Sequence, residues 1–133
     1  YIMNNKSSYL KLFNNHLNDF VDDILTIFPD DLDLKTCATF LKSMRKINPR
    51  MIITTWNTGV ANKYRNEIEK GDLSFFEEKD YATDLKNSSE EKKILEVIER
   101  IRNDVKNCGE DNKNKTMKYL QNLTKISDLY FSN

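Results

Sequence analysis

The sequence predicts an all-α fold, a compact bundle of about five main helices with a short turn anchored by aromatic side chains. Apolar residues recur every three or four positions in several long stretches, which is the spacing of one helix face. No stretch alternates apolar and polar residues as a half-buried strand would. The three glycines and two prolines fall mostly at the ends of these stretches. A single helical domain over residues 1–133 is expected.

The first helix is expected over residues 9–28, with Ser7 or Ser8 as its cap and Pro29 at its end. One continuous apolar stripe predicts it: Leu10, Phe13, Leu17, Phe20, Val21, Ile24 and Phe28. The polar residues 1–8 are interpreted as a free tail or as a flexible arm that grips a neighbouring chain.

A second helix should follow, with Asp31 or Asp33 as its cap. Its inner face consists of Leu34, Cys37, Ala38, Leu41 and Met44. It ends at Asn48-Pro49, a pair that also fits the cap and first position of a third helix. The third helix has apolar residues each four apart: Ile52, Trp56, Val60, Tyr64 and Ile68. Gly71 is expected to end it.

Gly59 lies inside this third helix, one turn from Trp56, where glycine costs about 1 kcal/mol relative to alanine. We interpret it as a notch that admits a neighbouring side chain, with a hinge as the alternative. The notch interpretation predicts that Gly59→Ala destabilises the fold through a clash.

Residues 72–87 are less regular than the rest of the chain. Asp72 is expected to cap a short turn that places Phe75 and Phe76 in the core. The core as a whole is expected to include Phe13, Leu17, Phe20, Ile24, Trp56, Val60, Tyr64, Ile98, Leu120 and Leu123.

Ser88 followed by Glu91 forms a capping box for a fourth helix, which continues to Cys108-Gly109. The apolar stripe of that helix is Ile94, Ile98, Ile101 and Val105. A polar loop over residues 110–115 should lead to the last helix. One face of the last helix carries Leu120, Leu123, Ser127 and Tyr130.

The charges balance overall but are unevenly distributed along the chain. Lysine plus arginine and aspartate plus glutamate number 21 each, so the whole-protein charge gives no argument for nucleic-acid or membrane binding. Residues 15–33 contain only acidic charges, and residues 35–66 contain only basic ones. No apolar run approaches the roughly 20 residues of a membrane span, so no membrane insertion is expected.

The acidic stretch 16–33 also contains the only histidine, His16, which raises the alternative of a divalent metal site. The EF-hand spacing that begins there is broken at Lys35. Asp22 and Asp23 lie near a helix C-terminus, so each needs a basic partner within the fold or on another chain. The remaining acids suit the positive end of the second helix dipole: Asp30, Asp31 and Asp33. We therefore expect helix ends here, with no metal and no other cofactor.

Exposed charges are the expected interaction residues. On the acidic side they are Asp19, Asp22, Asp23, Asp30 and Asp31. On the basic side they are Lys42, Arg45, Lys46 and Arg50. The basic run 42–50 could touch phosphates, but no helix-turn-helix, RNP or zinc-finger pattern accompanies it.

The sequence shows no catalytic pattern: no Ser–His–Asp arrangement, nucleophile elbow, P-loop or dinucleotide fingerprint. Cys37 and Cys108 lie far apart, and no second histidine is present to activate either thiol. Reduced thiols are expected, together with no catalytic residues and no enzyme activity.

Three blocks carry a family resemblance: YLKLFNNHLNDFVDDILTIFPDDLDLKT, NPRMIITTWNTGVANKYRNEIEKGDLSFFEEKDYATDL and NKTMKYLQNLTKISDLY. In this order and spacing they resemble a family of short uncharacterised α-helical proteins of large nucleocytoplasmic DNA viruses, phycodnavirus-like and mimivirus-like. The resemblance covers nearly the whole chain and is weakest over residues 86–110. It offers no family functional residues to carry over.

The resemblance implies a structural protein of the virion, a minor capsid or inner-shell component. Its partners would be other virion or capsid proteins, or further copies of itself. It would reside in the virion and, during assembly, in the host cell cytoplasm. The alternative is a nucleic-acid-associated factor that acts in packaging or transcription through the basic residues 42–50.

Overall fold

A computed structural model describes residues 5–77 and 89–132. Every regular element within these residues is helical, which confirms the predicted all-α class. In order they are α1 (Asn5–Ile27), α2 (Leu32–Ile47), α3 (Met51–Trp56), the π-helical segment η2 (Asn57–Ala61), α4 (Asn62–Lys70), the 3-10 turn η3 (Leu73–Phe76), α5 (Ser89–Lys106) and α6 (Glu110–Ser132). Because α3, η2 and α4 follow one another directly, the described residues form the predicted five main helices and one short turn.

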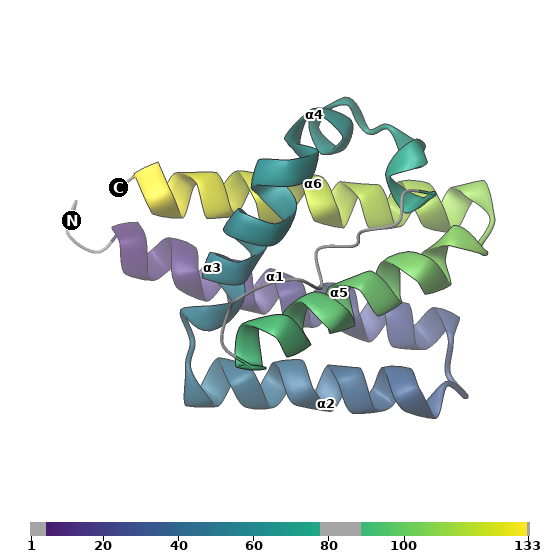
Figure 1. The fold of residues 1–133 in the computed structure, drawn as a ribbon, viewed down its shortest axis with the longest axis horizontal. Helices are drawn as coiled ribbons and strands as arrows, with labels where there is room; N and C mark the ends of the chain where they lie inside the picture. The colour runs from purple at the N-terminus through teal and green to yellow at the C-terminus, as the bar shows by residue number, and fades with distance from the viewer. Residues whose placement is uncertain (1–4, 78–88, 133) are drawn as a thin grey trace.

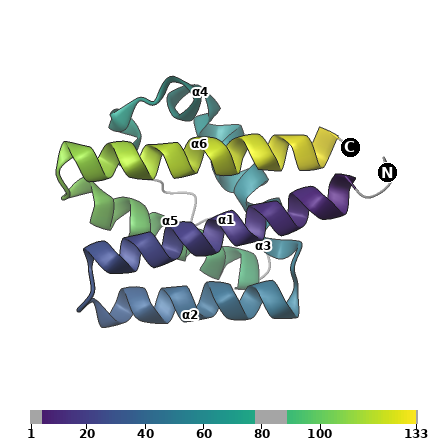
Figure 2. The same ribbon diagram turned by 180° about the vertical axis from the view of Figure 1, so that it is seen from behind.

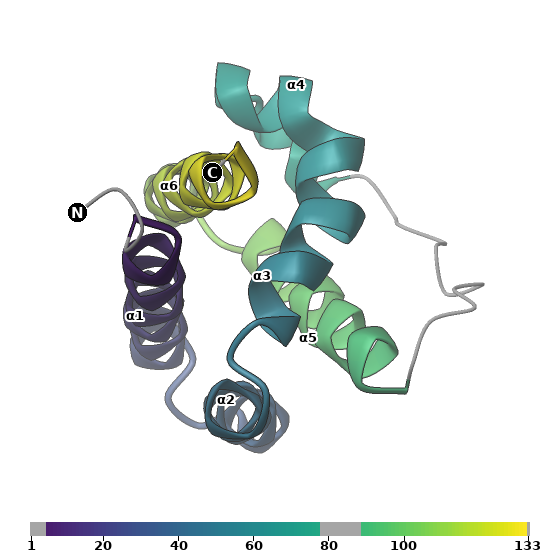
Figure 3. The same ribbon diagram turned by 90° about the vertical axis from the view of Figure 1, so that its left-hand side faces the viewer.

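Three helices form one layer of the bundle, and the others cross it (Figure 1). α1 lies between α6 and α2 and is antiparallel to both, as the view from behind shows (Figure 2). Seen end-on, the α3–η2–α4 segment runs across this layer, and α5 packs beside α3 on the same side (Figure 3). None of the helices within the described residues is long and apolar enough to cross a membrane.

α1 begins at Asn5, four residues before its expected start. Ser7 and Ser8 therefore lie within its first turns and do not cap it, contrary to the prediction. Residues 5–8 are all exposed, which explains why their polar composition resembles a tail. Residues 5–8, which were predicted to belong to a tail or flexible arm, are therefore part of α1. Residues 1–4 lie outside the described part of the chain. The end of α1 at Ile27, just before Pro29, agrees with the prediction.

Two predicted helix ends are confirmed by their geometry. Asp31 is the N-cap of α2, and its Oδ1 accepts a hydrogen bond from the Leu34 amide at 3.0 Å. Gly71 ends α4 in the left-handed conformation, with a φ of 67°. A side chain at this backbone conformation would be strained, which accounts for glycine at the position.

The start of the third helix was predicted wrongly. The carbonyl of Asn48 accepts a hydrogen bond from the Met51 amide at 3.1 Å, so Pro49 and Arg50 form a turn and α3 begins at Met51. A tertiary contact holds this turn, because Asn14 of α1 donates its Nδ2 to the Pro49 carbonyl at 3.1 Å. The buried Asn14 therefore ties the α2–α3 connection to α1.

The apolar residues of the third helix, which recur every four positions, can stay on one side of it because the helix contains the π-helical segment η2. An α-helix has 3.6 residues per turn, so side chains four apart drift by about 40° at each step. In η2 the Asn62 amide bonds the carbonyl of Asn57, five residues back, and the wider turn absorbs one residue. This returns Val60 to the buried side that Trp56 occupies. A second irregularity follows at Tyr64, whose backbone is non-helical.

The turn η3 forms as predicted. Asp72 caps it by accepting a hydrogen bond from the Ser74 amide at 2.9 Å. Phe75 and Phe76 are each 2% exposed, so the turn is anchored by two buried aromatic rings. The predicted capping box at the start of α5 depends on Ser88, which lies outside the described residues.

Residues 110–115, predicted as a polar loop, form the first turns of α6 instead. The α5–α6 connection consists only of residues 107–109. Glu110 and Asp111 occupy the first turn, where negative charge is favoured by the helix dipole. The segment is polar because most of it faces solvent, and solvent exposure was mistaken for irregular structure.

The core draws on every main helix, much as predicted. Eight of the ten predicted core residues are buried: Phe13, Leu17, Phe20, Ile24, Trp56, Val60, Leu120 and Leu123. Tyr64 and Ile98 are half-buried and pack against this core. Trp56 joins α3 to α6, because its indole N–H donates to the Thr124 hydroxyl at 3.1 Å.

Candidate interaction surface on the α1–α2 hairpin

Several aspartates of the acidic stretch contact groups on three helices, α2, α5 and α6. Asp31 accepts from the Leu34 amide and also pairs with Arg100 of α5, with 3.0 Å between Asp31 Oδ2 and Arg100 Nη2. Arg100 also bonds Asp104 at 3.1 Å and reaches Asp33 at 3.4 Å. The backbone hydrogen bond from Leu34, together with Arg100, holds the pKa of Asp31 below its usual range. Asp31 therefore stabilises the fold by capping α2 and by joining it to α5.

Asp22 and Asp23, for which a basic partner was expected, both find partners within the chain. Asp22 forms an ion pair with Lys42 of α2, at 2.9 Å between Oδ1 and Nζ. Asp23 accepts a hydrogen bond from the Tyr119 hydroxyl of α6, so its partner is a phenol and not a base. Each contact joins α1 to a neighbouring helix.

The basic run is also partly committed to internal contacts. Lys42 holds Asp22, and Arg45 donates to the side-chain oxygen of Asn15 on α1. Lys46 and Arg50 are exposed and form no ion pair within residues 5–77 and 89–132. The first two basic residues of the run therefore hold α2 against α1, whereas the last two are exposed to solvent.

Four of the nine predicted interaction residues have neither an ion pair nor a side-chain hydrogen bond in the described part of the chain: Asp19, Asp30, Lys46 and Arg50. All four are exposed. The other five predicted residues hold helices together. The structure thus divides the predicted set into internal contacts and surface charges that are available to a partner.

His16 does not join the aspartates near it in the sequence. Its ring packs against that of Tyr119, with 5.0 Å between the ring centroids. Among the described residues, no group of three or more His, Cys, Asp or Glu side chains is placed to hold a metal ion. The structure therefore does not bring His16 and the nearby acids together as ligands.

A pocket of about 140 Å³ lies between the end of α1 and the beginning of α6. Asp23, Lys115 and Tyr119 are among the polar residues that line it. The hydrogen bond to Asp23, assisted by burial, raises the pKa of Tyr119 to about 12. The hydroxyl–carboxylate contact lies in the lining of this pocket and links α6 to α1.

We expect Tyr119→Phe to remove the part of the tyrosinate absorbance change that occurs near pH 12. The folded-state pKa exceeds the value of about 10 for a free tyrosine, so this contact stabilises the fold below pH 10. The stabilisation is lost as the pH rises from 10 to 12, because the unfolded chain then binds fewer protons. Asp23→Asn is the matched variant and should return the titration of Tyr119 towards its ordinary range. Unchanged titration in Asp23→Asn would contradict the assignment.

The two cysteine side chains are half-buried and unpaired. Burial raises the pKa of both Cys37 and Cys108 above the ordinary value. A raised pKa disfavours the thiolate, which is the nucleophilic form.

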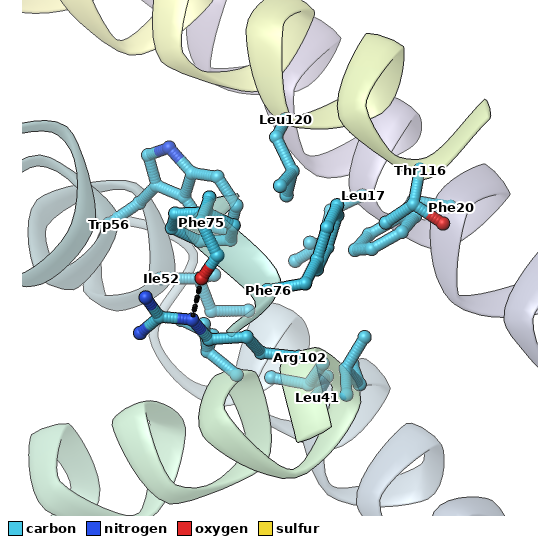
Figure 4. A pocket seen from close by; sticks show the side chains of 12 residues that line it. Leu17, Phe20, Leu41, Ile52, Trp56, Phe75, Phe76, Arg102, Thr116 and Leu120 are labelled. Atoms are coloured by element: carbon cyan, nitrogen blue, oxygen red, sulfur yellow. Dashed lines mark hydrogen bonds between the residues drawn. The ribbon is translucent and has the colours of Figure 1, made fainter. Parts of the chain in front are cut away.

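A buried arginine that sequence reasoning missed borders a small apolar cavity in the core (Figure 4). The side chain of Arg102 is 3% exposed, and its Nε donates to the Phe75 carbonyl at 2.6 Å. Its guanidinium lies 4.1 Å from the ring centroid of Phe75 and 4.5 Å from that of Tyr64. The cavity itself is about 20 Å³, which accommodates no more than one water molecule. The one available signal was that Arg102 follows the buried Ile101 and the half-buried Ile98 on the same helix, inside the apolar stripe.

Fold and surface together define an all-α helical bundle in which α2 lies at one edge of the three-helix layer (Figure 3) and the α1–α2 hairpin carries exposed charges. Comparison of the chain with protein-family models, with curated proteins and with solved structures finds no match in any of the three.

Proposed function

We propose that the chain is a structural protein that acts through protein–protein contacts, as a minor capsid or inner-shell component of a virus particle. The observation that carries the proposal is the charge left unpaired on the α1–α2 hairpin, negative at Asp19 and Asp30 and positive at Lys46 and Arg50. Charges of opposite sign on separate parts of one surface suit neighbours that meet through unlike faces. The viral context is supported by the resemblance of the three sequence blocks.

The alternative of a nucleic-acid-associated factor depends on the basic run 42–50. Two of its four cations, Lys42 and Arg45, are engaged with α1. Phosphate binding grows with the number of cations that can each release a counterion, so a run with two committed members is a weaker phosphate site. The internal contacts of the basic run therefore favour protein partners over nucleic acid.

Quantitative mass spectrometry of gradient-purified particles, with DNA-filled and empty shells measured separately, tests the proposal. We expect the chain in both fractions at a constant ratio to the major capsid protein. Presence only in DNA-filled particles would instead assign it to the nucleoprotein and support the alternative. Absence from both fractions would overturn the assignment to the particle.

A further inference from the structure

The two ends of α2 each present an exposed aliphatic side chain. Leu32 at the start of α2 is 73% exposed, and Ile47 at its end is 76% exposed. These are the most exposed of the large hydrophobic side chains in the described part of the chain. Neither contributes to the buried core, so the bundle itself gives no reason for an aliphatic residue at either position.

Charges of opposite sign surround these two side chains. Asp30 and Asp33 flank Leu32, whereas Lys46 and Arg50 flank Ile47. Asp30, Lys46 and Arg50 form no ion pair within the described residues. The side chain of Asp33 is 80% exposed even though it lies 3.4 Å from Arg100. We call Asp30, Leu32 and Asp33 the acidic end, and Lys46, Ile47 and Arg50 the basic end.

The two ends cannot neutralise each other within one molecule. Leu32 and Ile47 are fifteen residues apart on a continuous helix, which at 1.5 Å per residue separates them by about 22 Å. This exceeds twice the Debye length of about 8 Å at physiological salt, so the attraction between them is screened. Each end is therefore available to an opposite charge on another molecule.

We propose that the chain assembles head-to-tail with further copies of itself, the acidic end of one α2 meeting the basic end of the next. Leu32 of one copy would then pack against Ile47 of its neighbour, surrounded by pairs between the aspartates and the basic side chains. An apolar contact ringed by polar pairs excludes water from the centre, which is the usual arrangement of a protein interface. This inference rests on the proposed assembly function and names the partner.

The distribution of lysines on α2 disfavours the closed alternative, a twofold pairing of two α2 helices side by side. Lys35, Lys42 and Lys46 are spaced seven and four residues apart, so they lie along one side of the helix. An antiparallel twofold pairing would also set the acidic end of one copy beside the basic end of the other, but it would bring Lys35 of one copy beside Lys46 of the other, where like charges repel. A head-to-tail contact uses different surfaces on the two copies and avoids this repulsion.

Sedimentation velocity of the full chain over a range of concentrations tests the proposal. We expect concentration-dependent association that weakens when the salt is raised from about 50 mM to about 500 mM, because screening acts on the paired charges. The variant K46E/R50E should raise the dissociation constant by at least about tenfold. K118E/K125E makes the same charge change at exposed positions of α6 and should leave association unchanged. A wild-type chain that stays monomeric at all concentrations would overturn the proposal.

Mixing two charge-reversal variants tests the contact between unlike ends, and species larger than a dimer distinguish the head-to-tail contact from a closed twofold pair. K46E/R50E carries two acidic ends, and D30K/D33K carries two basic ends, so each variant alone should be monomeric. An equimolar mixture should assemble again, with the two variants in alternation. Recovery of assembly supports the unlike-end contact, whereas a mixture that stays monomeric overturns it. Circular dichroism of each variant establishes that the helices are intact.

The aliphatic contact has its own variant, Ile47→Ser, which removes the apolar group without changing the charge. Because Ile47 is exposed, the monomer should remain folded while the dissociation constant rises by at least about tenfold. Unchanged association in Ile47→Ser would exclude the Leu32–Ile47 contact. The particle measurement tests the proposed function independently of self-association. If purified particles lack the chain, the virion assignment is refuted even if the chain self-associates. A monomer found in particles refutes only the head-to-tail contact.

Discussion

Replacement of Arg102 by alanine is expected to lower the free energy of unfolding by about 3–5 kcal/mol. The arginine stem fills core volume, and its Nε satisfies the Phe75 carbonyl at 2.6 Å. Its guanidinium also lies against the rings of Phe75 and Tyr64 and bonds Glu99. Truncation leaves a cavity and an unsatisfied carbonyl at the junction of η3, α4 and α5. Urea denaturation followed by circular dichroism measures the loss.

Arg100, two residues earlier on α5, supplies the matched control. Its side chain is 34% exposed, so its pairs with Asp31 and Asp104 are partly screened by solvent. We expect Arg100→Ala to cost about 1 kcal/mol or less. Arg102→Lys should fall between the two, because lysine keeps the charge and loses the planar group that lies on the rings. Equal losses in Arg102→Ala and Arg100→Ala would show that burial does not set the contribution of Arg102.

Gly59→Ala is expected to destabilise the fold by about 1–2 kcal/mol net. A Cβ at this position would overlap Leu95 Cδ2 of α5 and lie 3.4 Å from Leu95 Cδ1. The leucine side chain must move, and we expect the cost of that movement to exceed the gain of about 1 kcal/mol from replacing a helical glycine by alanine. The geometry identifies Leu95 as the side chain that the predicted notch admits.

A double-mutant cycle with Leu95→Ala separates this clash from the hinge interpretation. Leu95→Ala removes the overlapping methyl groups, so adding Gly59→Ala in that background should be neutral or stabilising by up to about 1 kcal/mol. A hinge would instead make Gly59→Ala equally damaging with and without the leucine side chain. Thermal unfolding of the wild type, both single variants and the double variant gives the interaction free energy between positions 59 and 95.

The sequence predicted the helices whose apolar stripes are long and the ends that have a specific backbone chemistry. Gly71 was placed correctly, and Asp31 was one of the two expected caps, because a left-handed glycine and a carboxylate cap each have a local physical cause. The aromatic turn at Phe75 and Phe76 was predictable for the same reason, since two adjacent aromatic residues rarely remain in solvent. Local rules thus account for most of the fold.

The predicted element boundaries were wrong at two kinds of place. At one kind, a solvent-exposed part of a helix has the composition of a loop, and at the other, a contact between residues far apart in the chain determines the local structure. Residues 5–8 and most of residues 110–115 are helical and exposed, and neither segment carries an apolar stripe. The turn at Pro49 is fixed by Asn14, thirty-five residues earlier in the chain. No spacing rule anticipates a contact at that separation.

The interaction residues were predictable as a set but not individually. Charge type alone cannot show that Asp22 is paired with Lys42 while Lys46 is not. The pairing depends on how α1 and α2 face each other, which is a tertiary property. Arg102 was missed for the opposite reason, because an arginine is expected at the surface unless its partners are known.

The π-helical segment η2 affects how related chains should align with this one. Its wide turn contains one residue more than the same turn of an α-helix, between Trp56 and Asn62. A relative that lacked one residue there would form a regular α-helix and would keep Trp56 and Ile68 on the same buried side. We therefore expect single-residue gaps within residues 57–61 to be tolerated in homologues, whereas a gap elsewhere in α3 or α4 would turn the apolar stripe away from the core.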